Sequence, residues 1–266
     1  MSSLFSTEGM LRLDDIARPG LLCAFDFDGT LAPIVSVPEQ AVLPDDMRER
    51  LIALSEHAPV AIITGRSLRD VRERLGFVPD FLIGNHGLEG MPGWESQAVR
   101  HAALCRSWQK QLATALHEFG SDVSLEDKHY SLSLHYRHAR DPDMTAILLG
   151  RVFAQLVPHP RVVLGKYVFN LVAPDATHKG NALVQLIEAS AARSALYAGD
   201  DVTDEDVFRL ARNDLLSVRV ECSPDSSADF YLPHQHDVAQ LLDDLIERLR
   251  TAGAHNWMHT ATAGSS

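Results

Sequence analysis

The sequence predicts an α/β protein with a doubly wound parallel-sheet core and an inserted α+β cap. Short apolar runs alternate with helix-like periodicity at both ends of the chain, which is the order of a parallel sheet with crossover helices. The middle has the order helix, paired strands, helix, paired strands, which indicates an antiparallel insertion of about 75 residues. A chain of 266 residues with 45% hydrophobic content can bury one large core and that of a small second domain. We therefore expect core segments at 1–93 and 169–266 and a cap at 94–168.

Each element follows from a local pattern. Apolar runs predict the buried core strands Leu21–Phe25, Val60–Ile63, Phe81–Ile83, Ala195–Ala198 and Leu216–Val220. Amphipathic segments predict the core helices Asp45–Leu54, Leu68–Leu75, Asn181–Ala189 and Val238–Leu249. In the insertion we expect a helix from Pro92-Gly93 to Phe119, strands at Val123–Glu126 and Leu132–Tyr136, a helix near Met144–Leu156, and Arg161–Val172 broken by Gly165. The small polar residues of Thr251–Ser266 predict a frayed tail.

The most specific motif is Asp26-Phe27-Asp28-Gly29-Thr30, directly after the first predicted strand. Two carboxylates two residues apart at a strand's carboxyl end can both point into the crevice where open α/β sheets bind ligands. Carboxylates held so close repel each other, so they usually share a metal ion or divide acid and base roles. A polar strand end followed by an ordinary turn is the alternative interpretation.

Two later segments could complete a site around these carboxylates. The run Val60–Ile63 leads into Thr64-Gly65-Arg66, where a hydroxyl and backbone amides can bind a phosphate oxygen; a helix N-cap is the alternative role for Thr64. Lys179 stands at a predicted helix start, where the macrodipole disfavours a cation. We therefore expect a charge partner to hold Lys179 there, and an exposed surface lysine is the alternative.

Five carboxylates lie within the seven residues Asp200–Asp206, after the strand Ala195–Ala198. Such density costs Coulomb repulsion unless a cation binds or the side chains spread into water. The last three, Asp204–Asp206, can occupy the first turn of the next helix, where acids suit the dipole. Asp200 and Asp201 lie earlier, at the strand end, and we interpret them as part of a metal site.

Together these motifs resemble the four-motif signature of haloacid-dehalogenase-type phosphatases. Four fuller strings resemble the trehalose-6-phosphate phosphatases, over roughly residues 20 to 245: Thr64-Gly65-Arg66, Gly84-Asn85-His86-Gly87, Tyr130–Arg137 and Gly199–Glu205. The resemblance implies a haloacid-dehalogenase-like (Rossmannoid) core. That subfamily usually carries a glutamate after the glycine-lysine of its cap, and then Arg-Pro. Here Asn170 follows Gly165-Lys166, and Ala173 precedes Pro174.

The resemblance implies hydrolysis of a phosphate monoester through an aspartyl phosphate, with Mg²⁺ as cofactor. Asp26 would be the nucleophile, and Asp28 the acid and then the base. Mg²⁺ would lie between the Asp26 carboxylate, the Asp28 backbone carbonyl and Asp200, an oxygen-only site that suits this ion. Asp201 or Asp204 would hold metal-bound water.

The remaining roles also follow from the resemblance. Thr64 and Lys179 would bind the non-bridging phosphate oxygens. The substrate-binding residues would be Gly29, Arg66, Asn85, His86, Gly87, Glu126, Lys128, Arg137 and Asn170. We expect Asn170 to face the sugar together with Glu126 and Lys128.

Three functions remain open. The first is dephosphorylation of trehalose 6-phosphate in trehalose biosynthesis. The second is the same chemistry on another sugar or glycosyl-glycerate phosphate, which the departure at Asn170 permits. The third is a catalytically silent relative that binds a sugar phosphate.

Composition restricts partners and compartment. The formal net charge of −12 and pI near 5.5 argue against nucleic acid as a partner. No apolar stretch approaches the length of a membrane span, and Met1–Gly9 lacks the features of a signal peptide. Cys23, Cys105 and Cys222 lack metal spacing and read as reduced, mostly buried thiols. We expect a cytoplasmic enzyme that acts on a small sugar phosphate, as a monomer or alternatively a dimer.

Overall fold

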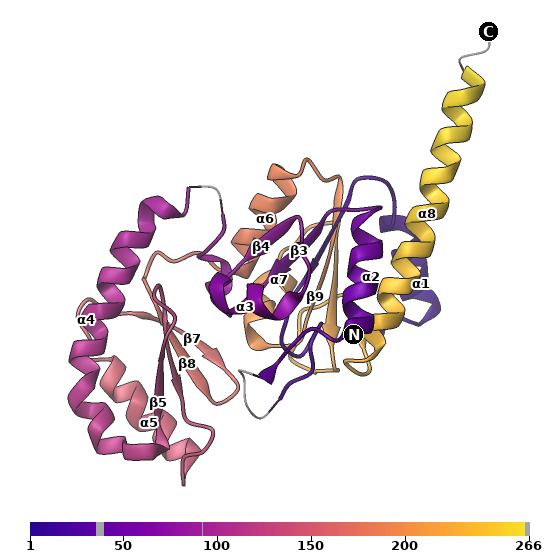
Figure 1. Cartoon of the computed structure of the whole chain (residues 1–266). Coiled ribbons are helices and arrows are strands. Elements are labelled where there is room, and N and C mark those ends of the chain that lie inside the picture. The colour runs from indigo at the N-terminus through magenta and orange to yellow at the C-terminus, as the bar shows by residue number, and fades with distance from the viewer. Residues whose placement is uncertain (36–39, 92, 264–266) are drawn as a thin grey trace.

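The computed structural model describes residues 1–35, 40–91 and 93–263 and contains two bodies, each built on a sheet (Figure 1). In spatial order, the strands of the larger sheet are β1 (Ser2–Ser3), β11 (Phe230–Leu232), β10 (Leu215–Val220), β9 (Ser194–Gly199), β2 (Leu21–Phe25), β3 (Val60–Ile63) and β4 (Phe81–Ile83). Every pair of neighbours in this sheet is parallel. This is the predicted doubly wound core, and the fold class is confirmed.

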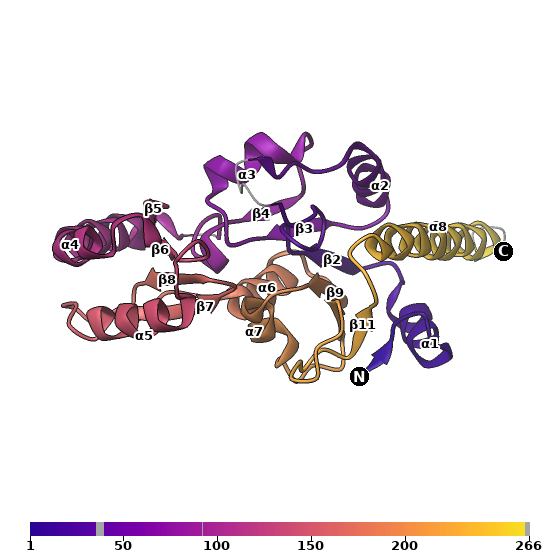
Figure 2. The same cartoon turned by 90° about the horizontal axis from the view of Figure 1, so that it is seen from below.

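Helices cover both faces of the core sheet. The first apolar cluster joins one face to α1 (Thr7–Ile16), α2 (Asp45–Ser55), α3 (Leu68–Leu75) and α8 (Asp237–Ala263). The second joins the other face to α6 (Lys179–Ala189) and α7 (Glu205–Phe208). Figure 2 shows α2 and α3 on the opposite side of β2 and β3 from α6 and α7.

Burial on both faces explains why the core strands read as unbroken apolar runs. Along β2, Cys23 and Phe25 enter the first cluster, whereas Leu22 and Ala24 enter the second. Successive side chains of a strand point to opposite faces, so a strand covered on both sides needs apolar residues throughout.

The smaller sheet is antiparallel, with the strands β5 (Ser124–Asp127), β6 (Leu132–His135), β8 (Val168–Val172) and β7 (Arg161–Gly165) in that order. One face packs against α4 (Glu95–Phe119) and α5 (Pro142–Phe153) through Trp108, Leu134 and Phe153. Figure 1 shows these two helices on the side of the sheet away from the core. All of β8 pairs with cap strands, so the expected boundary between residues 168 and 169 falls inside a strand, and a boundary after Val172 fits the pairing.

The structure also contains elements that the sequence did not predict. β1 and β11 extend the sheet at one edge, and α1 follows β1. The prediction of a frayed tail from Thr251 is wrong up to Ala263, because α8 continues to that residue; residues 264–266 lie outside the described chain. Cys23 and Cys105 are buried as expected, whereas Cys222 is exposed. No helix within the described ranges is long and apolar enough to cross a membrane.

Candidate active site

Three carboxylates meet at the carboxyl edge of the core sheet. Asp26 follows β2, Asp200 follows the neighbouring strand β9, and Asp204 ends the short 3₁₀ helix η4 (Val202–Asp204). One carboxylate oxygen from each lies within 4.8 Å of the others. Asp26 and Asp204 are buried, and Asp200 is half-buried. The parallel register of β2 and β9 therefore brings together residues that are far apart in the sequence.

Lys179 is the cation inside this cluster. Its Nζ lies 3.0 Å from Asp26 and 2.8 Å from Asp204, and its side chain is 1% exposed. Burial alone would lower the pKa of Lys179, but the carboxylates of Asp204 and Asp26 raise it above its usual value. The lysine is therefore charged, and it has the charge partners that its place at the start of α6 requires.

The cluster carries more negative charge than Lys179 offsets. Burial raises the pKa of Asp26 to about 8; Lys179 opposes this rise, and the carboxylates of Asp204 and Asp28 add to it. Burial likewise raises the pKa of Asp200 well above its ordinary value, with Asp26 and Asp204 as the main repelling charges. A bound divalent cation would remove these penalties, so this oxygen-rich donor set fits an ion such as Mg²⁺.

Gly29 is required by the close approach of Asp200. Its φ is +77°, and a Cβ at this position would lie 2.1 Å from Asp200 Oδ2. The hydroxyl of Thr30 is 3.4 Å from the other oxygen of Asp200. The motif turn is thus shaped around the Asp200 carboxylate.

Asp204 has little capacity left to bind a metal ion directly. Its Oδ1 accepts hydrogen bonds from Lys179 Nζ and from Tyr197 Oη, the latter at 2.5 Å, and its Oδ2 accepts from the backbone N–H of Asp201 at 2.9 Å. It is 0% exposed. These contacts suit a residue that orients Lys179 and the loop that follows β9.

An arginine holds the second motif aspartate. Arg66 donates from Nε and Nη2 to the two oxygens of Asp28, each at 2.7 Å, and from Nη1 to Asp70 at 2.7 Å. Thr64, which follows β3, is 1% exposed, and its Oγ1 accepts from the backbone N–H of Arg66 at 3.2 Å. Arg66, expected to bind substrate, is in this arrangement an ion-pair partner that engages both Asp28 oxygens.

The loop after β4 brings Asn85, His86 and Gly87 to the same edge. The His86 ring packs on Gly65, where a Cβ would lie 2.4 Å from the ring. Burial, with the positive charges of Lys128 and Lys179, lowers the pKa of His86 well below its usual value, so the ring is neutral near pH 7. Its Nδ1 is buried without a hydrogen-bond partner among the described residues.

Gly87 lets this loop pack on the segment before α6. Its φ is +112°, and a Cβ there would lie 2.8 Å from the carbonyl of His178. The Gly87 carbonyl accepts a hydrogen bond from Thr177 Oγ1 at 2.5 Å. The loop after β4 and the start of α6 are thus joined beside Lys179.

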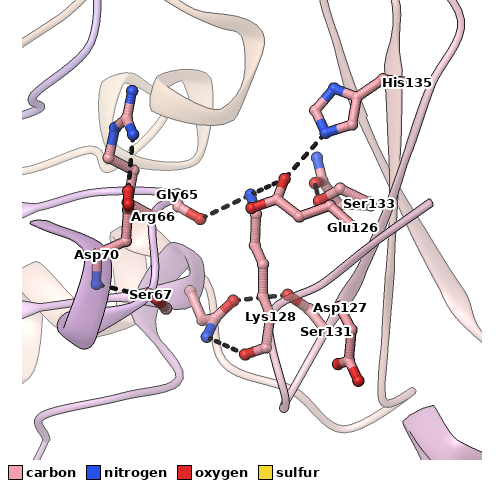
Figure 3. Close-up of polar contacts among 12 residues, drawn as sticks. Gly65, Arg66, Ser67, Asp70, Glu126, Asp127, Lys128, Ser131, Ser133 and His135 are labelled. Carbon is pink, nitrogen blue, oxygen red and sulfur yellow. Dashed lines mark hydrogen bonds and ion pairs between the residues drawn. The ribbon is translucent and has the colours of Figure 1, made fainter. Parts of the chain in front are cut away.

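From the cap, Lys128 and Glu126 approach the core (Figure 3). Lys128 Nζ donates to the Gly65 carbonyl at 3.2 Å and lies 3.8 Å from Glu126 Oε2, which also contacts His135 Nε2 at 2.9 Å. Arg137, by contrast, is exposed in the turn after β6. The structure therefore brings two of the expected cap residues next to the strand-end loop of Thr64.

Asn170 shares a face of the cap sheet with Glu126 but is buried. Ser133 pairs with Glu126 on one side and with Asn170 on the other, so the three side chains form a row across the strands. Asn170 is 3% exposed, and its Oδ1 accepts a hydrogen bond from Ser133 Oγ at 2.6 Å. For this buried amide to bind a sugar, its packing and its hydrogen bond with Ser133 would have to rearrange.

Several site residues were missed from the sequence. Tyr197 lies within a strand that reads only as core, and Glu89 stands in no motif. Arg161 of β7 donates to the Thr177 carbonyl at 2.9 Å, where the cap meets the core. No local pattern marks these residues, because their contacts arise from tertiary packing.

Known proteins are similar to this chain. The family model described as trehalose-phosphatase matches residues 24–237. A trehalose-phosphate phosphatase of Mycobacterium tuberculosis is 30% identical over 241 residues, which are 86% of this chain and 62% of that protein. Another protein of that organism, described as an uncharacterized glycosyl hydrolase, is 34% identical over 255 residues, or 90% of this chain but 19% of its own length. The chain thus spans only part of these relatives.

Solved structures share the fold. The C-terminal domain of a Candida albicans trehalose-6-phosphate phosphatase has a TM-score of 0.74 at 22% identity, covering 92% of this chain and 98% of that one. A sucrose-phosphatase from Synechocystis, in complex with sucrose and phosphate, has a TM-score of 0.55 at 19% identity, covering 86% and 98%. The family match spans the carboxylate cluster, Lys179 and the cap, and this chain belongs to the trehalose-phosphatase family.

Proposed function

We propose that this chain is a Mg²⁺-dependent phosphatase that hydrolyses trehalose 6-phosphate to trehalose and phosphate. The observation that carries the proposal is a cluster of three residues in a chain of the trehalose-phosphatase family: Asp26 and Asp200 lie at adjacent ends of parallel strands, and the buried Lys179, at the start of α6, contacts Asp26. Such a cluster joins a nucleophile to a positive charge that can receive phosphate oxygens.

In the first half of the reaction, an Asp26 carboxylate oxygen bonds to phosphorus while the bond from phosphorus to the sugar oxygen breaks. A proton from Asp28 neutralises the departing sugar oxygen. Lys179 and Thr64 bind the non-bridging oxygens, and Lys179 offsets charge that gathers at Asp26. For this role, Asp28 must exchange its contact with Arg66 for one with the substrate, and we propose that substrate entry accompanies this exchange.

In the second half, a water oxygen bonds to phosphorus and the bond between phosphorus and Asp26 breaks. Asp28 takes the proton of that water, and inorganic phosphate leaves. Asp26, Asp200 and the backbone carbonyl of Asp28 would hold Mg²⁺, with Asp201 or Asp204 holding its bound water. When bound, the ion supplies positive charge that keeps the carboxylates ionised and lowers the cost of gathering phosphate oxygens beside them.

The sugar would lie between the strand-end loops and the core-facing side of the cap sheet. On the cap side, Lys128 contacts Gly65 in the loop of Thr64, and Glu126 lies beside Lys128. Arg66, His86 and Gly87 line the core side in this proposal. Enclosure by the cap would exclude bulk water from the reacting phosphate.

A panel of sugar phosphates tests the proposed substrate. With Mg²⁺, trehalose 6-phosphate should give the highest kcat/KM, at least roughly tenfold above sucrose, glucose and glycosyl-glycerate phosphates, because hydroxyl-reading sites discriminate strongly. The measurement is release of inorganic phosphate. A higher kcat/KM for another sugar phosphate would make that compound the substrate of the same mechanism. If no compound of the panel releases phosphate, only a role in binding sugar phosphates would remain.

Asn170→Ala should lower the free energy of unfolding but change KM only slightly. The variant leaves the Ser133 hydroxyl without its acceptor, at a cost of about 1 kcal/mol in the free energy of unfolding. Because the amide is 3% exposed, KM should change by less than about threefold. Denaturant unfolding and steady-state kinetics measure the two effects. A rise in KM of roughly tenfold or more at unchanged stability would mean that Asn170 contacts the sugar directly.

A further inference from the structure

The turn between the cap strands β5 and β6 rests on the core loop that follows β4. Two hydrogen bonds cross between them, and a third joins the turn to the loop after β3. Ser131 Oγ donates to Asn85 Oδ1 at 2.6 Å, Asn85 Nδ2 donates to the Lys128 carbonyl at 3.3 Å, and Lys128 Nζ donates to the Gly65 carbonyl at 3.2 Å. Figure 3 shows Lys128 and Ser131 on the cap side of this junction. Two of the three bonds use the side chain of Asn85.

Both N–H donors of the buried Asn85 amide are used, and its oxygen already accepts one hydrogen bond. An asparagine side chain offers an acceptor oxygen and two N–H donors. The oxygen accepts from Ser131, and the nitrogen donates to the Lys128 carbonyl and to Glu89 Oε1, the latter at 2.9 Å. Asn85 is also 0% exposed. The amide therefore has no free N–H donor and no exposed surface, so in this arrangement it faces the cap turn and not a substrate.

The core fixes the direction of this amide. Asn85 has a φ of +47°, a left-handed conformation that asparagine tolerates better than most residues, and its backbone N–H donates to the Arg66 carbonyl at 2.8 Å. Glu89, which receives the amide, also accepts the N–H of Leu68 at 2.6 Å and so ties it to the start of α3. The frame that presents Asn85 to the cap therefore consists of core residues.

We propose that Asn85 is a positioning residue that holds the β5–β6 turn on the core and thereby places Lys128 beside the strand-end loop of Thr64. Lys128 reaches Gly65 only while the turn is docked, because the same residue supplies the carbonyl that Asn85 binds. Release of the Asn85 contacts would leave the catalytic carboxylates of the core in place but would free the cap hairpin from the site.

Hydrogen exchange tests the docking without any substrate. Asn85→Ala and Ser131→Ala should each accelerate amide exchange across Lys128–Ser131 by roughly fivefold or more, because the docked turn opens more often. The double variant should exchange no faster than Asn85→Ala, since that change alone already removes the contact with Ser131. Gln111→Ala, which removes hydrogen bonds to Val157 within the cap and away from this turn, is the matched control and should leave this exchange unchanged.

Steady-state kinetics test whether an undocked turn weakens binding of the sugar phosphate, and this test rests on the proposed function. Each single variant should raise KM for the sugar phosphate roughly tenfold, and the double variant should raise it no further. Hydrolysis of p-nitrophenyl phosphate, which has no sugar for the cap to enclose, should stay within about twofold of the wild type. Unchanged exchange in both single variants, or fully additive effects on KM, would overturn the positioning role.

The two arms fail separately. If the wild type releases no phosphate from any sugar phosphate, the proposed function fails, while exchange of the turn still decides whether Asn85 docks it. If Asn85→Ala does not fold, Ser131→Ala carries the test, because it removes one hydroxyl of the same contact and leaves the core frame of Glu89 and Leu68 intact.

Discussion

Asp26→Asn should abolish phosphate release while leaving the fold intact. An amide cannot form the acyl phosphate, so we expect kcat to fall by more than about a hundredfold, or about 2.7 kcal/mol of transition-state stabilisation. The amide has nearly the shape of the carboxylate, and Lys179 keeps its contact with Asp204 at 2.8 Å. Because burial makes the Asp26 carboxylate costly, the free energy of unfolding in EDTA should stay equal or rise.

The measurement combines steady-state kinetics with denaturant unfolding. Asp225→Asn makes the same chemical change at an exposed loop position and should leave both quantities unchanged. Residual turnover above a hundredth of the wild type in Asp26→Asn, with the fold intact, would show that another group attacks phosphorus.

The core could be predicted from the sequence because each of its strands is buried on both faces. An unbroken apolar run such as Leu21–Phe25 identifies a strand, and the polar residue after it marks the carboxyl edge of the sheet. Asp26, Thr64 and Asp200 follow strands β2, β3 and β9 in this way, so their proximity follows from parallel pairing alone. By contrast, β1 has only two residues, too few to give a period.

The contacts between side chains could not be predicted, because they depend on how loops and domains pack. Arg66 and Asp28 stand 38 residues apart, and neither motif indicates that they form an ion pair. Asn85 belongs to a string that predicted substrate binding, yet its amide is turned to a cap hairpin 46 residues later in the chain. Burial of Asn170 likewise depends on Ser133 in the neighbouring cap strand, a partner that the pattern of a single strand does not reveal.

If the chain has the proposed phosphatase activity, removal of divalent metal should abolish it, and Mg²⁺ should restore it. Burial raises the pKa values of Asp26 and Asp200, and the repulsion among three carboxylates beside one ammonium raises them further. An ion that binds only the folded state stabilises it, by about 1.4 kcal/mol at ten times its Kd. We therefore expect Mg²⁺ to raise the Tm of the EDTA-treated protein by roughly 3–6 °C. Zn²⁺ should substitute poorly, because this site offers only oxygen ligands.

Comparison of Asp200→Ala with Asp206→Ala tests which aspartate of the acidic cluster binds the metal ion and which only belongs to the helix. Asp200→Ala removes a carboxylate from the buried cluster, so the Mg²⁺ concentration for half-maximal activity should rise by at least about tenfold and the Mg²⁺-dependent rise in Tm should be lost. Asp206 lies in α7 with its side chain 40% exposed, 3.8 Å from His178, and its removal should change neither quantity measurably. Activity titrations and thermal unfolding with and without Mg²⁺ check both variants. A specific metal site needs Asp200 as a ligand but not Asp206, which lies six residues later. Equal losses of Mg²⁺ affinity in the two variants would therefore mean that the cluster attracts the ion only through its overall negative charge.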